Sequence, residues 1–307
     1  MNADNRPYTL KNTLKLNFQY LLLAVLSLLP LAAHAQQLNW EGSTGAFVTP
    51  FAYTAASPEN GIGRPAVAYH YLNAGKVIGQ QTQLSLTVGL YKRLEFGYTG
   101  SINKSGDTAG LSPLFNGNFN TFHGKLNLVS ENAHKLAFLP AISAGFVART
   151  QVRHVGGVIN SKDTHNADFY LVATKTVTQA LPKVPIVLNL GVRASNAAVY
   201  GIAGNVDNYK ALAFGAVGFV LPGPGGSKWI VGSEAAQQPH QLNINTAAAP
   251  VYASLPTTLT YFVRILPSPS KLPLNIDFGV AQAAGRIYTG VDVKARAQFA
   301  TGISYRF

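Results

Sequence analysis

Apolar and polar residues alternate along segments of about ten residues through much of the chain after residue 35. In the last segment, 297–307, Phe299 and Ile303 share one face, whereas Gly302 and Ser304 share the other. Side chains of a β-strand point alternately to its two faces, so this pattern predicts a strand with one apolar and one polar face. Such strands are typical of a transmembrane β-barrel, whose outer wall meets lipid.

Twelve segments fit this period, and bacterial single-chain barrels have even strand numbers. The predicted strands are 65–73, 80–90, 94–102, 118–129, 135–149, 166–177, 184–195, 209–220, 227–236, 256–266, 272–282 and 296–307. Short connections at 91–93, 130–134, 178–183, 221–228 and 267–271 alternate with longer ones near 103–117, 150–165, 196–208, 237–255 and 283–295. Outer-membrane barrels have short periplasmic turns and longer outer loops. The sequence therefore predicts an all-β, antiparallel transmembrane barrel of about 12 strands in this orientation.

A water-soluble β-sandwich or lipocalin-like barrel is the main alternative fold, because it could bury the same apolar faces. Composition favours the membrane barrel. Charged residues make up only 12% of the chain, about half the usual share of ~25%, and a soluble surface needs more charge than this.

The N-terminus predicts export. Arg6, Lys11 and Lys15 precede an apolar run over 20–33, and Ala33-His-Ala35 is a small-x-small cleavage site. The run is shorter than the ~20 residues that a spanning helix needs. We therefore expect residues 1–35 to be a signal peptide cleaved after Ala35, which leaves a formal charge of +10 of the original +12.

Residues 36–64 do not alternate well and contain Pro50, Pro58, Gly61 and Gly63. Three interpretations stay open: a plug in the barrel lumen, a periplasmic lead-in, or an extra edge segment before the first strand. A lead-in packed under the barrel is the favoured one. The expected organisation is a signal peptide (1–35), an N-terminal lead-in or plug segment (36–64) and an outer-membrane barrel (65–307).

Two short sequences resemble known patterns. The C-terminal residues Gly302, Ile303, Tyr305 and Phe307 resemble the signal read by bacterial barrel-assembly machinery, with a final aromatic residue and hydrophobic residues at alternate positions before it. The stretch 38–50 (LNWEGSTGAFVTP), with 66–73 and onward through Gly97, resembles an uncharacterised family of exported bacterial outer-membrane proteins. This second resemblance implies the location and the fold, and it supplies no site residues.

Candidate chemistry is sparse. The glycine-rich stretch 223–228 has the order Ser-Lys rather than Lys-Ser and precedes a strand, so it is interpreted as a turn and not a phosphate loop. Asp163, His165 and Asp168 lie together in a predicted outer loop and are interpreted as solvated loop polarity rather than as a cation site. We predict no catalytic, cofactor-binding or metal-binding residue, and a membrane lipid hydrolase is the weakest alternative.

Charged residues within strands are more informative, because charge on the lipid face costs ~2–4 kcal/mol at the midplane. Phase with apolar neighbours directs these side chains into the lumen. The lumen-charge candidates are Glu95, Lys125, Arg193, Glu234, Arg264 and Asp277. Such charges either select solutes in a pore or pair to brace the interior, and bracing is slightly favoured.

The predicted function is a porin-like channel or transporter for a small solute in the outer membrane. A non-conducting structural or envelope-assembly barrel is the alternative. The expected partners are outer-membrane lipids and lipopolysaccharide, the barrel-assembly machinery and a small-molecule solute. Nucleic acid is not expected, because the basic residues are scattered and the protein is exported.

Overall fold

The computed structural model describes most of the chain after residue 37. The described residues are 38–107, 117–150, 166–178, 181, 184–199, 203–238, 242–246, 249–253, 257–267, 272–284 and 297–307. The predicted signal peptide, 1–35, lies outside this part of the chain.

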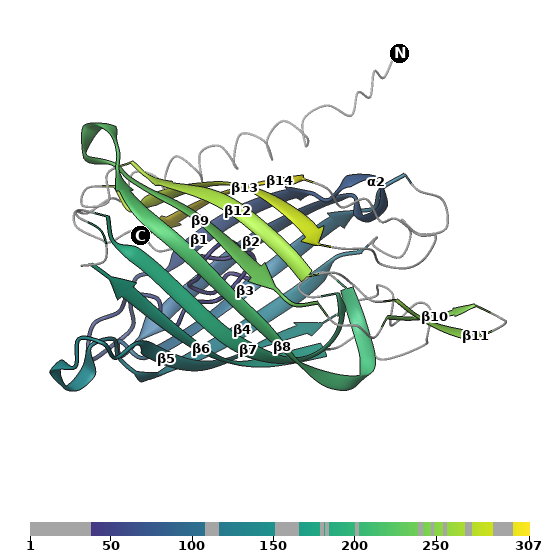
Figure 1. Cartoon of the computed structure of the whole chain (residues 1–307), viewed down its shortest axis with the longest axis horizontal. Coiled ribbons are helices and arrows are strands. Elements are labelled where there is room, and N and C mark those ends of the chain that lie inside the picture. Colours follow the sequence, from purple (N-terminus) through teal and green to yellow (C-terminus); the bar gives the residue numbers. More distant parts are fainter. Residues whose placement is uncertain are drawn as a thin grey trace, which may run out of the picture.

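Twelve antiparallel strands form a closed barrel in the order β1-β14-β13-β12-β9-β8-β7-β6-β5-β4-β3-β2 (Figure 1). The first and last strands close it, with Ala66 opposite Arg306 and Leu72 opposite Ala300. The barrel strands are β1 (Ala66–Asn73), β2 (Gln80–Leu90), β3 (Leu94–Lys104), β4 (Phe119–Val129), β5 (Ala141–Thr150), β6 (Asn166–Val177), β7 (Ile186–Val199), β8 (Ala203–Pro222), β9 (Lys228–Ala236), β12 (Thr257–Leu266), β13 (Leu274–Ala284) and β14 (Gln298–Arg306). The predicted fold is confirmed.

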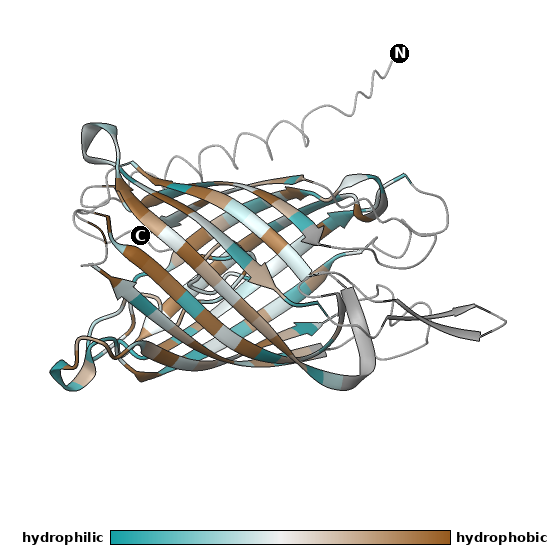
Figure 2. Cartoon of the chain, in the orientation of Figure 1, coloured by the Kyte–Doolittle hydropathy of each residue, from teal (hydrophilic) through white to brown (hydrophobic). Residues whose placement is uncertain are grey.

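The two faces of the wall differ in character. In β2, Leu84 and Leu86 are exposed on the outside, whereas Gln83 and Ser85 are buried inside. Apolar and polar colours alternate along strands around the barrel (Figure 2). An apolar outside and a polar inside reverse the arrangement of a water-soluble barrel and match a wall surrounded by lipid.

The two ends of the barrel also differ. Phe307 lies at the end with the shorter connections, called here the short-turn end, which is at the left of Figure 1. At the opposite end lie the short helix α2 (Gly75–Ile78) and a separate hairpin of β10 (Leu242–Thr246) and β11 (Ala249–Ala253). Among the described residues, no helix is long and apolar enough to cross a membrane.

Three predicted ranges differ in detail from the structure. β5 begins at Ala141 rather than 135, because Asn132, His134 and Lys135 have positive φ around the 3₁₀ turn η2 (Ala133–Lys135). β7 and β8 extend through most of the predicted loop 196–208, with a register shift between Ser195 and Ala197. The predicted loop 237–255 contains the β10–β11 hairpin. A second 3₁₀ turn, η3 (Pro224–Gly226), connects β8 to β9 as a tight turn.

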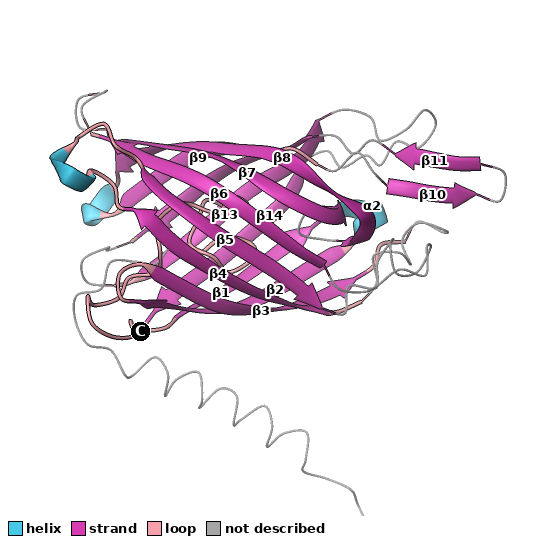
Figure 3. Cartoon of the chain, turned by 90° about the horizontal axis from the view of Figure 1, so that it is seen from below, coloured by secondary structure: helices cyan, strands magenta, loops and turns pink. Residues whose placement is uncertain are grey.

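The N-terminal residues 38–58, called here the inner segment, run inside the barrel (Figure 3). The chain leaves the interior at the short-turn end, where Gly63 N donates to Gly89 O at 2.7 Å and Ile62 bridges to Leu90. Beyond Pro65 it enters β1. The segment therefore lies in the space that the wall encloses.

The outward face can be tested with Leu84, whose side chain is 63% exposed near the middle of β2. Leu84→Arg should destabilise the barrel in lipid vesicles by ~2–4 kcal/mol, because it places a charge in the hydrocarbon layer. Urea-unfolding titrations in vesicles measure this difference. Phe138→Arg, exposed in the β4–β5 connection, is the matched control and should be nearly neutral. Equal effects of the two changes would contradict a lipid-facing wall.

Candidate functional site

The inner segment folds into tight turns of its own. Asn39 Oδ1 accepts hydrogen bonds from the backbone N–H of Glu41 at 3.1 Å and of Ser43 at 2.9 Å. Gly42 completes this turn with a φ of +84°, and a Cβ there would lie 2.5 Å from Thr99 Oγ1. The turn therefore needs glycine both for its backbone conformation and for its close approach to the wall.

One side of the segment is apolar. Trp40, Phe47 and Phe51 form a buried cluster with Ile230 of β9 and Phe262 of β12. Burying each large apolar side chain contributes ~1.5–3 kcal/mol. The interior therefore contains a small hydrophobic core between the segment and the β9–β12 side of the wall.

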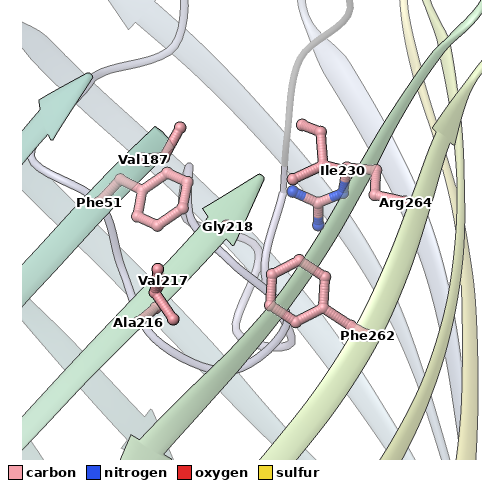
Figure 4. A pocket seen from close by; sticks show the side chains of 8 residues that line it. All are labelled: Phe51, Val187, Ala216, Val217, Gly218, Ile230, Phe262 and Arg264. Atoms are coloured by element: carbon pink, nitrogen blue, oxygen red, sulfur yellow. The ribbon is translucent and has the colours of Figure 1, made fainter. Parts of the chain in front are cut away.

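A small cavity remains beside this core (Figure 4). Its volume is about 10 Å³, at the lower limit for one water molecule. The lining residues are Phe51, Val187, Ala216, Val217, Gly218, Ile230, Phe262 and Arg264. A solute has no room in it.

The opposite side of the segment is polar and meets Glu95 of β3. The Glu95 carboxylate accepts hydrogen bonds from Ser43 Oγ at 2.7 Å, Thr44 N at 3.0 Å and Ala55 N at 2.6 Å, and also from Thr44 Oγ1. Lys125 of β4 lies 3.0 Å from the same carboxylate. One buried acid thus fastens two parts of the segment to the wall.

Backbone carbonyl groups of the segment find donors on the neighbouring strands. Lys125 Nζ donates to Thr44 O and Tyr53 O, each at 2.9 Å. Asn127 Nδ2 donates to Ala52 O at 3.1 Å, and Asn189 Nδ2 donates to Pro50 O at 3.1 Å. Buried backbone groups are costly when unpaired, so these side chains replace the partners that a sheet would supply.

A second acid, Glu234 of β9, holds the turn at 48–49. Its carboxylate accepts hydrogen bonds from Val48 N at 2.6 Å, Thr49 N at 2.8 Å and Thr49 Oγ1 at 2.8 Å. On the neighbouring strand β12, Arg264 pairs with Asp277 of β13 and donates to Gly45 O at 3.0 Å. The acidic Glu234 therefore accepts hydrogen bonds from N–H groups of the segment, whereas the basic Arg264 donates to one of its carbonyl groups.

The turn at 39–43, called here the tip of the segment, carries Glu41, whose carboxylate contacts two arginines. Arg193 Nη2 of β7 lies 3.0 Å from Glu41 Oε2, and Arg149 Nη2 of β5 contacts Glu41 Oε1. Asp168 of β6 accepts from the other nitrogen of each arginine, at 2.8 Å from Arg149 and 3.2 Å from Arg193. Two guanidinium groups thus lie between two carboxylates, all four buried.

Glu41 belongs to the inner segment and not to a spanning strand. Burial alone would raise the pKa of its carboxyl, but the charges and hydrogen bonds of Arg149 and Arg193 outweigh burial and hold the pKa at about 2. Glu41 is therefore ionised at neutral pH and pairs with the arginines as a carboxylate.

All six lumen-charge candidates are buried inside the barrel. Glu95, Lys125, Arg193, Glu234 and Arg264 hydrogen-bond to the inner segment directly. Asp277 acts through Arg264. The structure thus brings these residues together around residues 38–58 rather than around an open space.

The interpretation of Asp168 as loop polarity was wrong, because it lies in β6 and is buried between two arginines. Asp163 and His165 lie outside the described residues. Sequence reasoning also missed Arg149 and Glu41. Arg149 has the same strand parity as Ser143, which faces inward, and this signal could have found it. Glu41 is the only charged residue in 38–58.

The residues of the predicted barrel-assembly signal lie in and after β14. Gly302 faces the interior, where a Cβ would lie 2.5 Å from the His70 ring, and Ile303 is exposed outside. The rings of Tyr305 and Phe307 meet edge to face at 5.2 Å. Their role as a signal stays a prediction.

The sequence profile of a family described as "Protein of unknown function (DUF3034)" matches residues 35–258. No curated protein matches the chain. The NanC porin has a TM-score of 0.43 at 10% identity, covering 79% of this chain and 98% of that one. An outer membrane channel from Pseudomonas putida F1 has a TM-score of 0.44 at 12% identity, covering 84% and 98%. The translocator domain of autotransporter NalP from Neisseria meningitidis has a TM-score of 0.36 at 12% identity, covering 80% and 87%.

Glu95→Gln tests the attachment of the inner segment. The change leaves the buried ammonium of Lys125 without its carboxylate, which costs ~3–5 kcal/mol. We expect faster amide hydrogen exchange at 43–55, measured by mass spectrometry, with the barrel strands still protected. Glu59→Gln is the control, because Glu59 and its partner Lys92 have exposed side chains (80% and 58%). Unchanged exchange in Glu95→Gln would show that this acid does not hold the segment.

Glu41 predicts a pH dependence. Its folded pKa of about 2 lies below the ordinary value of 4.5, so ionisation of Glu41 stabilises the folded state fully above pH 4.5. This contribution decreases as the pH falls below 4.5 and is lost near pH 2. The difference in unfolding free energy between wild type and Glu41→Gln, from urea titrations at several pH values, should follow that course. A difference that does not change with pH would contradict the ion pairing.

Proposed function

The chain belongs to this family of proteins of unknown function (DUF3034), and from that premise we propose that it is an outer-membrane, porin-like channel closed by its inner segment. In the described state the segment acts as a plug. Conduction of a small solute requires the plug to leave the lumen or to rearrange within it.

The apolar outer wall supports the membrane location. Exposed leucine, phenylalanine and tyrosine side chains surround the barrel, and the inner face carries the charges. A closed barrel with this surface satisfies the backbone groups of every strand within a bilayer. The short connections at the end with Phe307 support the periplasmic orientation of that end.

The observation that carries the plug proposal is the way the segment is bound. Its backbone is held by side chains that project from the wall, such as Glu95, Lys125 and Glu234, and not by pairing with a strand edge. Side-chain contacts of this kind can be exchanged for water one at a time. The wall strands keep their own ladder of hydrogen bonds while this happens.

A second candidate is a non-conducting structural barrel. The ion-pair group at Glu41 favours it, because buried and fully paired charges make the segment a permanent part of the interior. In that case the segment acts as a core for the barrel. Conductance in a planar bilayer separates the two functions, because only a channel passes current.

The proposal also includes export of the protein, its insertion into the membrane and its lipid surroundings. The mature protein begins after cleavage at Ala35 and is inserted by the barrel-assembly machinery through its C-terminal residues. Lipopolysaccharide and the other outer-membrane lipids surround the wall. The alternation of residues toward Phe307 supports the C-terminal part of this proposal.

Planar-bilayer conductance tests the channel function. The wild-type protein should show rare or no current steps. Glu95→Gln/Glu234→Gln should show frequent ones, because the two substitutions remove the carboxylates that accept hydrogen bonds from backbone N–H groups of the plug. Heat-modifiable migration on gels confirms that each variant is folded. A folded double variant without current steps would contradict the channel and leave the structural barrel.

A disulfide gives the matched control. The chain has no cysteine, and Thr174 Oγ1 lies 2.7 Å from Ala52 N. Ala52→Cys with Thr174→Cys in the double variant should join the plug to β6 and abolish the steps, and a reducing agent should restore them. Steps that persist with the disulfide formed would show that current does not require plug movement.

A further inference from the structure

The inner segment brings a single charge into the lumen. Glu41 is the only acidic or basic residue in 38–58, and its carboxylate reaches two guanidinium groups on different strands. The rest of the segment is bound through its backbone, hydroxyl groups and apolar side chains. The tip of the segment therefore presents a carboxylate to a site that the wall has built.

Both arginines also contact residues of the wall. Asp168 accepts one hydrogen bond from Arg149 and one from Arg193. The Tyr170 ring lies 5.6 Å from the Arg193 guanidinium carbon, within cation–π distance. Each arginine therefore directs its other terminal nitrogen toward one carboxylate, with one contact to each oxygen of Glu41.

The anionic partners of this group differ in origin from those of the other buried cations. Lys125 has Glu95 as a wall partner, and Arg264 has Asp277. Arg149 and Arg193 share Asp168 on the wall, and the second carboxylate that both contact, Glu41, comes from the inner segment. Displacement of the segment would therefore remove a carboxylate from both arginines, and guanidinium groups bind carboxylates in a fixed plane.

We propose that Arg149 and Arg193 form a binding site for the carboxylate of a small solute, and that Glu41 occupies it when the plug is in place. This inference rests on the proposed channel function and names its substrate class, a solute that carries a carboxylate. A carboxylate solute and the plug then compete for one pair of arginines. Solute binding would favour the displaced plug.

Chemical rescue tests the site in the full chain. Glu41→Ala leaves the arginine pair without its anion, and hydrogen exchange at 43–51 should become about tenfold faster, as expected for the loss of a charge-assisted hydrogen bond. Acetate should return most of this protection, because it restores a carboxylate between the arginines. Acetamide, which has the same shape without the charge, and chloride at equal ionic strength should not.

The wild type and one further variant serve as controls. Acetate should have no effect on wild type, where Glu41 fills the site, or on Glu41→Ala/Arg193→Gln, where half of the site is missing. Rescue by acetamide to the same extent, or equal rescue without Arg193, would overturn the proposal. Because exchange is measured on the folded barrel, this test does not depend on whether the protein conducts.

A second measurement covers the case in which Glu41→Ala does not fold. In the conducting Glu95→Gln/Glu234→Gln variant, glucuronate should reduce the open-channel current more than glucose, and adding Arg193→Gln should remove that difference. Equal reduction by both sugars would overturn the carboxylate site. If Glu41→Ala folds and the Glu95→Gln/Glu234→Gln variant does not conduct, the channel function fails and the acetate experiment decides the site.

Discussion

The lumen wall and the inner segment each supply the hydrogen-bonding partners that the other lacks. Without the segment, Glu95 and Glu234 would lose the N–H and hydroxyl groups that they accept from. Without the wall, the turns of 38–52 would leave buried backbone groups unpaired, which costs more than a typical hydrogen bond contributes. The polarity of the inward side chains, the turns of the segment and the closed lumen all depend on this exchange.

The alternation of apolar and polar residues was sufficient to predict the strands of the wall, but it did not predict which residues lie inside the barrel. A two-residue period identifies a strand and its inward charges, such as Arg193 and Asp277, because each strand is read independently. The path of residues 38–58 depends on contacts with strands up to about two hundred residues away, which no local pattern records. The sequence favoured a lead-in below the barrel, and the structure places 38–58 inside. The prediction for Asp168 was wrong for the same reason, because its role as an ion-pair partner depends on Arg149 and Arg193 on neighbouring strands.

The interior combines two kinds of attachment with different consequences. The cluster of Trp40, Phe47 and Phe51 is non-directional and tolerates small shifts against β9 and β12. The Glu41 group is directional and fixes the tip of the segment at one place. A channel needs the first kind to release its plug at moderate cost, and the second kind provides a point at which a charged solute can intervene.

The entry of the inner segment at the short-turn end, directly before β1, has a consequence for how the molecule assembles. β1 is one of the two strands at the seam, so the part of the chain that comes first is enclosed by the pairing that comes last. Val48 must meet Glu234 across 186 positions of sequence, a separation typical of slow folding. The strand that closes the barrel is thus covalently continuous with the segment that lies inside it. Closure of the seam and placement of the interior are therefore coupled through β1.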